Sequence, residues 1–494
     1  MTSDTEFLWG VATSAYQSEG GFNIPGGPRN NWGDAEDAGD VVRTGASSDF
    51  WNRWAEDFAR CATLGLNTFR LGIAWARVEP AQGQIDFTAL DQYVEMLESC
   101  RSHGMEPIVT LHHFTHPAWG GTDFWLRPDA AALFEGFAKL VVEYVNRHLM
   151  HPIRYWITIN EPNMLVLNTY IGRQFPGNAR IGFDTVVHAY NGLLAGHVHA
   201  YNAIHDLSEL HGWPTPIVTL NNFCNDLYLT DKLVVDLLFL RERNIPRSKV
   251  GEYLRKKSDE FTRELRNAHL PLRKDLAYWC GALFKWVNLK ISARWFHPEF
   301  MDPLLDAIYA SPRKQLLDII AFDYYDPFTA HAFRLPVFWD HEFKNKSFRS
   351  WVINTVTSKW WDWRALPAGL GFFCELYARD YDRPILIAEN GMALRRNVSN
   401  LHTPRRDGLT RSEFLRIHLE ELQRVVKKGV RVVGYLHWSL FDNYEWGTFT
   451  PRFGLFSIDY KKGTERVAQD HLGDRPSETY AEIIRAWRKE EKKP

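Results

Sequence analysis

The sequence contains few cysteines, and they do not form the patterns that disulfide-rich or zinc-binding domains use. Its 494 residues include five cysteines, which are scattered and form no CxxC pair: Cys61, Cys100, Cys224, Cys280 and Cys374. An odd and scattered set argues against a disulfide framework and against a zinc ribbon. We therefore expect the protein to reside in a reducing compartment.

The chain also lacks an excess of charge of either sign, and it lacks a long apolar run. It has 58 Lys and Arg against 60 Asp and Glu, a formal net charge of -2. This balance argues against a nucleic-acid-binding protein, because such proteins usually carry a basic excess. The longest apolar stretches, such as Leu237–Leu240, are far shorter than the roughly 20 residues of a membrane-spanning helix. The segment from Met1 to Phe7 has neither the basic nor the apolar region of a signal peptide, so we expect a cytoplasmic protein.

Aromatic residues, in contrast, are abundant. The sequence contains 20 Trp, 31 Phe and 19 Tyr. A large aromatic core explains such a composition most simply. Sugar binding is the functional alternative, because the apolar faces of pyranose rings pack on aromatic side chains.

Short apolar runs of the β type alternate with amphipathic stretches along the chain. The runs are Phe7–Ala12, Thr68–Ile73, Glu106–Leu111, Tyr155–Asn160, Pro216–Leu220, Ile319–Phe322, Ile385–Ala388 and Val432–Leu436. The amphipathic stretches include Trp51–Leu64, Ala89–His103, Ala130–Asn146, Val187–Ile204 and Arg411–Lys428. Strands that alternate with helices predict a parallel sheet, and eight strands close a (β/α)₈ barrel. No linker or repeat divides the chain, so we expect a single domain over residues 1–494 with an insertion at about residues 228–302.

Polar and reactive side chains follow the predicted strands, at the end of a (β/α)₈ barrel where chemistry takes place. They include Arg70, His112, His113, Asn160, Glu161, Asn221, Asn222, Asp323, Tyr324, Tyr325, Glu389, Asn390 and Trp438. Two carboxyl groups across a pocket, without a cluster of metal ligands, suit glycoside cleavage. One protonates the leaving oxygen, and the other attacks the anomeric carbon or activates water. We expect Arg70 to keep a neighbouring carboxylate charged and Tyr325 to orient it.

Six longer stretches carry a more specific signal. They are Phe7-Leu-Trp-Gly-Val-Ala-Thr-Ser-Ala-Tyr-Gln-Ser-Glu19, Asn67-Thr-Phe-Arg-Leu-Gly-Ile-Ala-Trp-Ala-Arg77, Trp156-Ile-Thr-Ile-Asn-Glu-Pro-Asn163, Ile385-Leu-Ile-Ala-Glu-Asn-Gly391, Trp438-Ser-Leu-Phe-Asp-Asn-Tyr-Glu-Trp446 and Pro451-Arg-Phe-Gly-Leu455. In this order they resemble glycoside hydrolase family 1, the β-glucosidase family, over nearly the whole chain. The resemblance implies a (β/α)₈ barrel and a retaining double displacement. The chemistry needs neither a metal nor an organic cofactor, because side chains supply every reacting group.

The resemblance also implies roles for individual residues. Glu161 resembles the acid/base and Glu389 the nucleophile, with Asn160 binding the sugar 2-hydroxyl. Arg70 and Tyr325 resemble the pair that brackets the nucleophile. The other residues expected to bind the sugar are Gln17, His113, Glu445 and Trp446, which hold its hydroxyls, and Trp438, which stacks under its ring.

Two positions narrow the expected activity. Glu161 distinguishes the chain from the thioglucosidase branch, which has Gln there. Glu445 suits neutral sugar hydroxyls and would repel a phosphate. We therefore expect an exo-acting β-glycosidase that releases terminal β-D-glucosyl or related residues from a small-molecule glycoside. A transglycosidase with the same machinery and a non-catalytic sugar- or lipid-binding scaffold remain alternatives, and the oligomeric state is open.

The chain departs from the family pattern at two places near the expected site. Asp323 stands where the family has Asn, either as a harmless isosteric exchange or as a third carboxyl group that raises the pKa of the acid. After the third strand, His113-Phe114-Thr115 followed by His116 replaces the usual His-Trp-Asp. This change alters the rim of the sugar pocket, so a preference for glucose over galactose or fucose does not follow.

A basic segment forms most of the expected insertion. Residues 241–294 contain 14 Lys and Arg against 6 Asp and Glu, a net charge of +8. An aromatic-rich stretch follows, with Phe338, Trp339, Phe348, Trp351, Trp360, Trp361 and Trp363. Solvated helices packed on the barrel are one interpretation. The other is a weak peripheral contact with an anionic membrane, in which Trp279 and Trp286 insert and the aglycone is a lipid or another apolar group.

Overall fold

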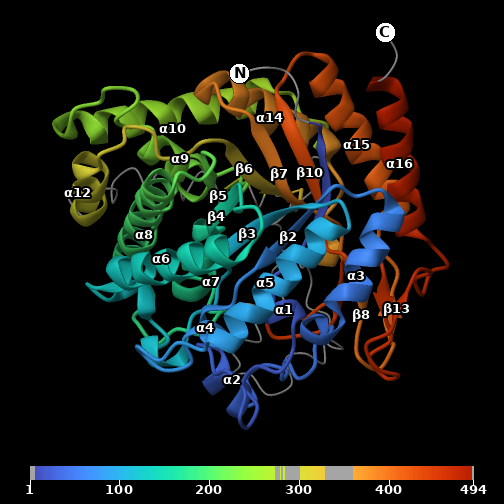
Figure 1. Cartoon of the computed structure of the whole chain (residues 1–494). Helices are drawn as coiled ribbons and strands as arrows, with labels where there is room; N and C mark the ends of the chain where they lie inside the picture. The colour runs from blue at the N-terminus through green and yellow to red at the C-terminus, as the bar shows by residue number, and fades with distance from the viewer. Residues whose placement is uncertain are drawn as a thin grey trace.

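Eight parallel strands form a closed barrel in the computed structural model, which describes residues 6–272, 279, 282–283, 301–326, 328 and 360–491 (Figure 1). The barrel strands are β1 (Leu8–Ala12), β2 (Thr68–Gly72), β3 (Glu106–His112), β4 (Tyr155–Asn160), β5 (Ile217–Phe223), β6 (Ile320–Tyr324), β7 (Ile385–Asn390) and β10 (Val432–Trp438). They follow the chain order around the barrel, with β10 closing on β1. The predicted (β/α)₈ fold is confirmed, and each predicted strand overlaps an observed one.

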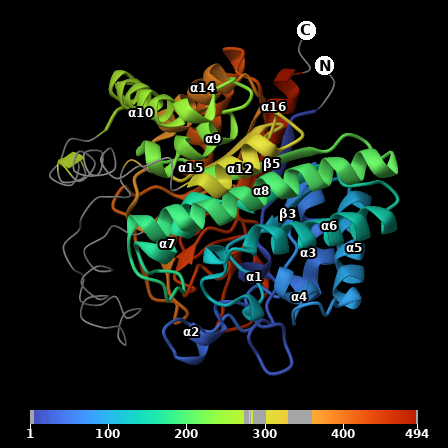
Figure 2. The same ribbon diagram turned by 90° about the vertical axis from the view of Figure 1, so that its left-hand side faces the viewer.

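Helices surround the barrel, and the strands are buried on both faces as parallel strands require. The longer helices are α3 (Phe50–Leu64), α5 (Phe87–Ser102), α6 (Ala130–His148), α7 (Pro162–Tyr170), α8 (Phe183–His211), α10 (Val250–Asn267), α12 (Asp302–Ala310), α14 (Pro367–Tyr381), α15 (Arg411–Lys427) and α16 (Pro476–Glu491). The shorter ones are α1 (Ala15–Ser18), α2 (Gly33–Asp37), α4 (Trp75–Val78) and α9 (Lys232–Leu238). Figure 2 shows α8 crossing the outside of the barrel, where it packs against α6, α7 and α12.

Local sequence explains where several helices begin and end. Thr410 and Glu413 form a reciprocal capping box that starts α15. Gly212 ends α8 in the left-handed conformation, with φ of 65°, which glycine adopts without strain. Small accessory sheets, which the sequence did not predict, lie outside the barrel: β8 (Leu394–Arg396), β9 (His402–Thr403) and β11 (Pro451–Arg452) form one, and β12 (Ser457–Ile458) pairs with β13 (Arg466–Val467).

The expected insertion is described only in part. Its α10 buries Val250, Leu254 and Phe261 and exposes a charged face on the periphery of the molecule (Figures 1 and 2). Several basic side chains in and beside this helix form salt bridges with acidic residues, as in Lys249–Glu252 at 2.9 Å and Lys257–Glu260 at 2.7 Å. This part of the segment is therefore a helix packed on its neighbours by an apolar stripe.

The structure describes only some of the residues that were expected to contact a membrane. Trp279 is 59% exposed, whereas Trp286 and residues 338–351 of the aromatic stretch lie outside the described residues. Among the helices that the structure describes, none is long and apolar enough to cross a membrane.

Strand register determines which polar residues become neighbours at the carboxyl end of the barrel. Asp323 on β6 is paired with Glu389 on β7, and Asn160 on β4 is paired with Asn221 on β5. The start of β1 and the end of α16 lie at the top of Figure 1, whereas α2 and the loop after β1 lie at the bottom. The carboxyl ends of the strands therefore face away from the start of β1 and the end of α16.

Candidate active site

Glu389, at the end of β7, is held by two hydrogen bonds. Arg70 Nη1 donates to Oε1 at 2.8 Å, and Tyr325 Oη donates to Oε2 at 2.7 Å. Burial raises the pKa of the Glu389 carboxyl, while Arg70 and Tyr325 act in the opposite direction because both stabilise the anion. The result is a carboxylate that has a fixed orientation and a compensating positive charge.

Arg70 is itself fixed by four further acceptors, although it is fully buried. Its Nε donates to Thr110 Oγ1 at 2.9 Å, and its Nη1 also contacts the carbonyl of Ala388 at 3.2 Å. Its Nη2 donates to Asn160 Oδ1 at 2.5 Å and to Asn221 Oδ1 at 3.4 Å. The guanidinium therefore links β2, β3, β4, β5 and β7, and it sets the orientation of both asparagines.

Glu161 immediately follows β4 and precedes α7, in a left-handed backbone conformation with φ of 38° and ψ of 62°. A non-glycine residue in this region costs about 1–3 kcal/mol, and such strain is concentrated at functional sites. The Glu161 amide donates to the Asn221 carbonyl at 2.8 Å, which holds the turn in place. Burial and the nearby Glu389 raise the pKa of the Glu161 carboxyl well above its usual value.

Asp323 brings a third carboxyl group into the same place. Carboxyl oxygens of Glu161, Asp323 and Glu389 all lie within 4.8 Å of one another, and all three residues are buried. Burial, Glu389 and Glu161 raise the pKa of Asp323 well above its usual value. Among the described residues this is the group that could also hold a metal ion, but Arg70 already places a positive charge beside it.

A second wall of the site is formed by Gln17, Trp438 and Glu445. Glu445 accepts hydrogen bonds from Gln17 Nε2 and from Trp438 Nε1, both at 3.1 Å. His113 stacks between the rings of Trp438 and Trp446, at centroid distances of 5.7 and 5.8 Å. These five residues come from three separate segments of the chain, so the closed barrel brings them together.

Two buried nitrogen atoms in the site have no hydrogen-bond partner among the described groups. They are Asn160 Nδ2 and His113 Nδ1. Asn160 cannot turn its amide to change this, because its Oδ1 accepts from Arg70 and Asn221. A buried polar atom without a partner is costly, so these atoms are suited to bind the oxygen atoms of a ligand.

Aromatic rings surround Phe114, at the place where the sequence departs from the family pattern. Phe114 packs against Trp446 and Phe175, at centroid distances of 4.8 and 5.1 Å. His116 contacts the carbonyl of Gly121 at 2.8 Å, and burial lowers its pKa to about 4, so it is a neutral structural residue.

On another side of Glu389, Phe223 stacks on Tyr325 at 6.0 Å and contacts Trp363 at 6.2 Å. The end of the aromatic-rich stretch therefore reaches the site.

Asn221 and Thr110 are parts of the site that the sequence did not single out for a role. Asn221 Nδ2 donates to Asn160 at 2.7 Å and also to Asp323, so it connects the two sides of the cluster. Its position at the end of a predicted strand was the available signal. No sequence pattern indicated that Thr110 would accept a hydrogen bond from Arg70.

Comparison with known proteins agrees with this geometry. The family model for glycosyl hydrolase family 1 matches residues 2–485. The chain belongs to this family. It is therefore a glycoside hydrolase that acts on a glycoside, and the family is one of retaining β-glycosidases. A scaffold without activity, the alternative from another class, is set aside.

The curated relatives of this family 1 enzyme include 6-phospho-beta-galactosidases. A 6-phospho-beta-galactosidase 1 of Streptococcus pneumoniae is 26% identical over 94% of this chain and 96% of its own length. A 6-phospho-beta-galactosidase of Leptotrichia buccalis is 25% identical, over 92% and 94%.

Among solved structures, a beta-glycosidase from Pyrococcus horikoshii is 24% identical, with a TM-score of 0.64 over 97% of this chain and 94% of its own. A beta-glucosidase from Thermotoga maritima in complex with azafagomine is 18% identical, with a TM-score of 0.69 over 97% of both chains. These likenesses support the fold of the family 1 enzyme.

Proposed function

We propose that this enzyme is a retaining exo-β-glycosidase for neutral terminal sugars, with Glu389 as nucleophile and Glu161 as acid/base. The observation that carries the proposal is a pair of carboxyl groups within 4.8 Å in opposite surroundings. Such proximity suits retention, because an inverting enzyme needs about 6.5–9.5 Å between its carboxyl groups to hold a water. Glu389 is held as an anion by Arg70, whereas Glu161 has no such cation bonded to it among the described residues.

In the first step, a Glu389 oxygen attacks the anomeric carbon while the bond to the leaving oxygen breaks. The Glu161 proton passes to that oxygen, and the aglycone leaves as an alcohol. Glu389 is then esterified to the sugar, and Glu161 is a carboxylate. Asn160 Nδ2, which has no other partner among the described groups, binds the 2-hydroxyl in this proposal, a contact that strengthens in the transition state.

In the second step, Glu161 removes a proton from water, and the resulting hydroxide attacks the anomeric carbon. The bond to Glu389 breaks, and the sugar leaves with its original configuration. A hydroxyl of another molecule can replace the water, and the product is then a new glycoside. We therefore propose transglycosylation by the same residues as an accompanying activity.

The surroundings of Glu445 favour a neutral sugar over a phosphorylated one. Its charged neighbours are Glu389 and Asp442, which are acidic, and Gln17 and Trp438 donate to its oxygens. Arg452, a nearby cation that could bind a phosphate, is already engaged: it donates to the Ile458 carbonyl at 3.2 Å and lies 3.6 Å from Asp442. Arg411 also pairs with Asp442, at 3.4 Å. A phosphate beside Glu445 would therefore meet the carboxyl groups of Glu445 and Glu389, while both arginines are already bound to Asp442, so the substrate named for the 6-phospho-beta-galactosidases does not suit this site.

Aromatic side chains at the site suit a flat or apolar aglycone. Phe223, Tyr325 and Trp363 form one group beside Glu389, and Phe114 and Trp446 form another at the rim. An aglycone that packs on such rings gains from the burial of apolar surface. We therefore propose an aryl or alkyl glycoside as the preferred substrate.

We also propose that the reaction takes place in the cytoplasm. The cysteines that the structure describes, Cys61, Cys100, Cys224 and Cys374, are free and buried. Free thiols suit a reducing compartment, in which disulfides are rare.

A substrate panel tests the proposal. Hydrolysis of nitrophenyl β-glucoside, β-galactoside, β-fucoside and β-xyloside is compared with that of the 6-phosphorylated glucoside and galactoside. We expect at least one neutral glycoside to be turned over at least tenfold faster, by kcat/KM, than its phosphorylated form. Glu389→Ala, purified in parallel, controls for contaminating glycosidase. A preference for the phosphorylated substrates would contradict the argument from Glu445.

A further inference from the structure

Asp323 lies against the proposed acid/base and has an oxygen that nothing else satisfies. Its Oδ2 accepts from Asn221 Nδ2, whereas its Oδ1 is buried without a donor among the described residues. A carboxyl oxygen of Asp323 lies within 4.8 Å of a carboxyl oxygen of Glu161 and of one of Glu389. Two carboxyl groups can form a hydrogen bond only if at least one of them carries a proton, because an ionised carboxylate has no hydrogen to donate.

Asn221 fixes this arrangement. Both hydrogens of its amide are used, one on Asn160 Oδ1 and one on Asp323 Oδ2. Its own Oδ1 accepts from Arg70 at 3.4 Å, so the amide cannot turn over without loss of these bonds. Asp323 is therefore held with its free oxygen inside a buried acidic cluster.

The groups that face Asp323 come from every strand around it. Glu161 follows β4, Cys224 follows β5, Tyr325 follows β6, Glu389 lies on β7, and the cation Arg70 lies on β2. Arg70 donates directly to Glu389 and not to Asp323. Ionisation of both Glu161 and Asp323 would then place two adjacent buried anions beside a third carboxylate.

We propose that Asp323 is a positioning residue that shares a proton with Glu161 and keeps the acid/base protonated into alkaline solution. The inference rests on the proposed role of Glu161. When Glu161 gives its proton to the leaving oxygen, both carboxyl groups of the pair are anions, but Glu389 loses its charge as it is esterified, so the net charge of the cluster does not change. When Glu161 takes a proton from water in the second step, the starting state returns. Asp323 itself neither gains nor loses a proton over the whole cycle.

The pH profile of kcat/KM for an alkyl glycoside tests this inference, because an alcohol leaving group depends on protonation by Glu161. Asp323→Asn keeps the shape and the bond from Asn221, but it replaces the second carboxyl by an amide that donates to the Glu161 anion. We expect the alkaline limb to move down by about 1–3 pH units, the separation typical of paired carboxyl groups. The acid limb, set by Glu389 with Arg70 and Tyr325, should stay in place.

Two further variants make the result decisive. Asp231→Asn removes another buried carboxyl, which bonds to Asn222 and Asn225 instead of Glu161, and it should leave the alkaline limb unmoved. Asp323→Ser also lacks the carboxyl group, and it should show the same downward shift of the alkaline limb. It replaces Asp323→Asn in the test if that variant fails to fold. An alkaline limb that stays in place or rises in an active Asp323 variant would overturn the inference. Absence of turnover in the unmodified enzyme would instead overturn the proposed function.

Discussion

Replacement of Arg70 by Met tests the electrostatic basis of the site, because it removes the cation and keeps most of the apolar stem. Glu389 would lose its 2.8 Å ion pair and would keep the hydrogen bond from Tyr325. Loss of one partner from a buried pair costs about 3–5 kcal/mol. At about 1.4 kcal/mol for each pKa unit, this corresponds to a rise of about 2–4 units in the pKa of Glu389.

The sign of the pH dependence follows from this rise. A carboxyl group whose pKa is higher in the folded than in the unfolded state destabilises the fold as the pH rises above the unfolded value. Protonation of Glu389 relieves the cost at low pH, so the variant should lose less stability at pH 5 than at pH 8. The acid limb of the kcat/KM profile should also move to higher pH by about 2–4 units, because Glu389 must be ionised to attack.

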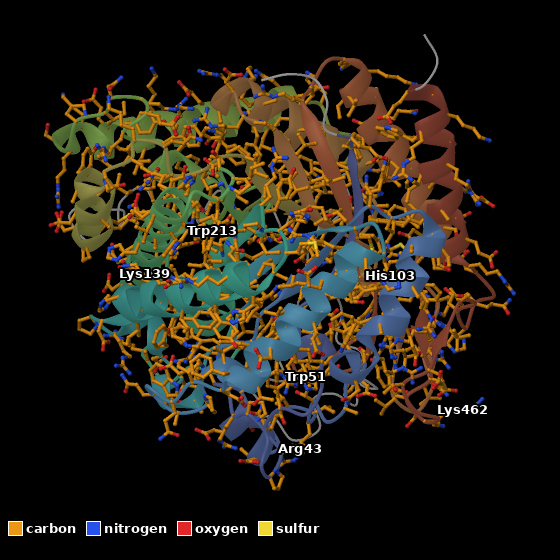
Figure 3. All side chains as sticks on the ribbon, in the orientation of Figure 1. Arg43, Trp51, His103, Lys139, Trp213 and Lys462 are labelled. Carbon is orange, nitrogen blue, oxygen red and sulfur yellow. The ribbon has the colours of Figure 1, made fainter. Side chains whose placement is uncertain are left out.

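Urea unfolding at both pH values and the pH profile with a nitrophenyl glycoside provide the measurements. Arg77→Met is the matched control, since Arg77 forms another buried pair, 2.6 Å from Glu19, and lies over Trp51, which is labelled in Figure 3. It should lose stability without a change in the acid limb. The reasoning would be refuted if Arg70→Met remained active with its acid limb unmoved.

The remaining predictions concern the two carboxyl groups proposed as catalytic and the basic segment. Glu389→Ala should lose turnover, and azide should restore part of it and yield the α-glycosyl azide; the β product, identified by NMR, would assign the nucleophile elsewhere. Glu161→Ala should slow alkyl glycosides far more than activated aryl glycosides, because a good leaving group needs little protonation; equal slowing across a leaving-group series would argue against an acid. Co-sedimentation should detect weak binding to anionic but not zwitterionic vesicles that is lost as salt screens the charge. If no binding is detected at low salt, the membrane hypothesis is wrong and residues 241–294 only pack against the barrel.

The barrel strands could be predicted because each is a short apolar run between polar or turn-forming residues. Parallel strands are covered on both faces, so their sequences show this pattern clearly. Helix ends were predicted less well, as in α8, which extends from Phe183 to His211 and not merely over Val187–Ile204. Its outer turns are more polar, and packing against neighbouring helices stabilises them. The short strand pairs, such as β12 with β13, depend on contacts that a local pattern does not contain.

The sequence by itself determined which residues stand at the ends of the strands, and hence that Glu161, Asp323 and Glu389 meet at one end of a barrel. It left open whether Asp323 was a harmless exchange or a third member of the cluster. That question depended on register, since the pairing of β6 with β7 places Asp323 beside Glu389. It depended also on the left-handed turn at Glu161, whose carboxyl group lies within 4.8 Å of that of Asp323. Tertiary structure alone decided the burial of these carboxyl groups, and burial sets their protonation because the buried site stabilises charge less than water does.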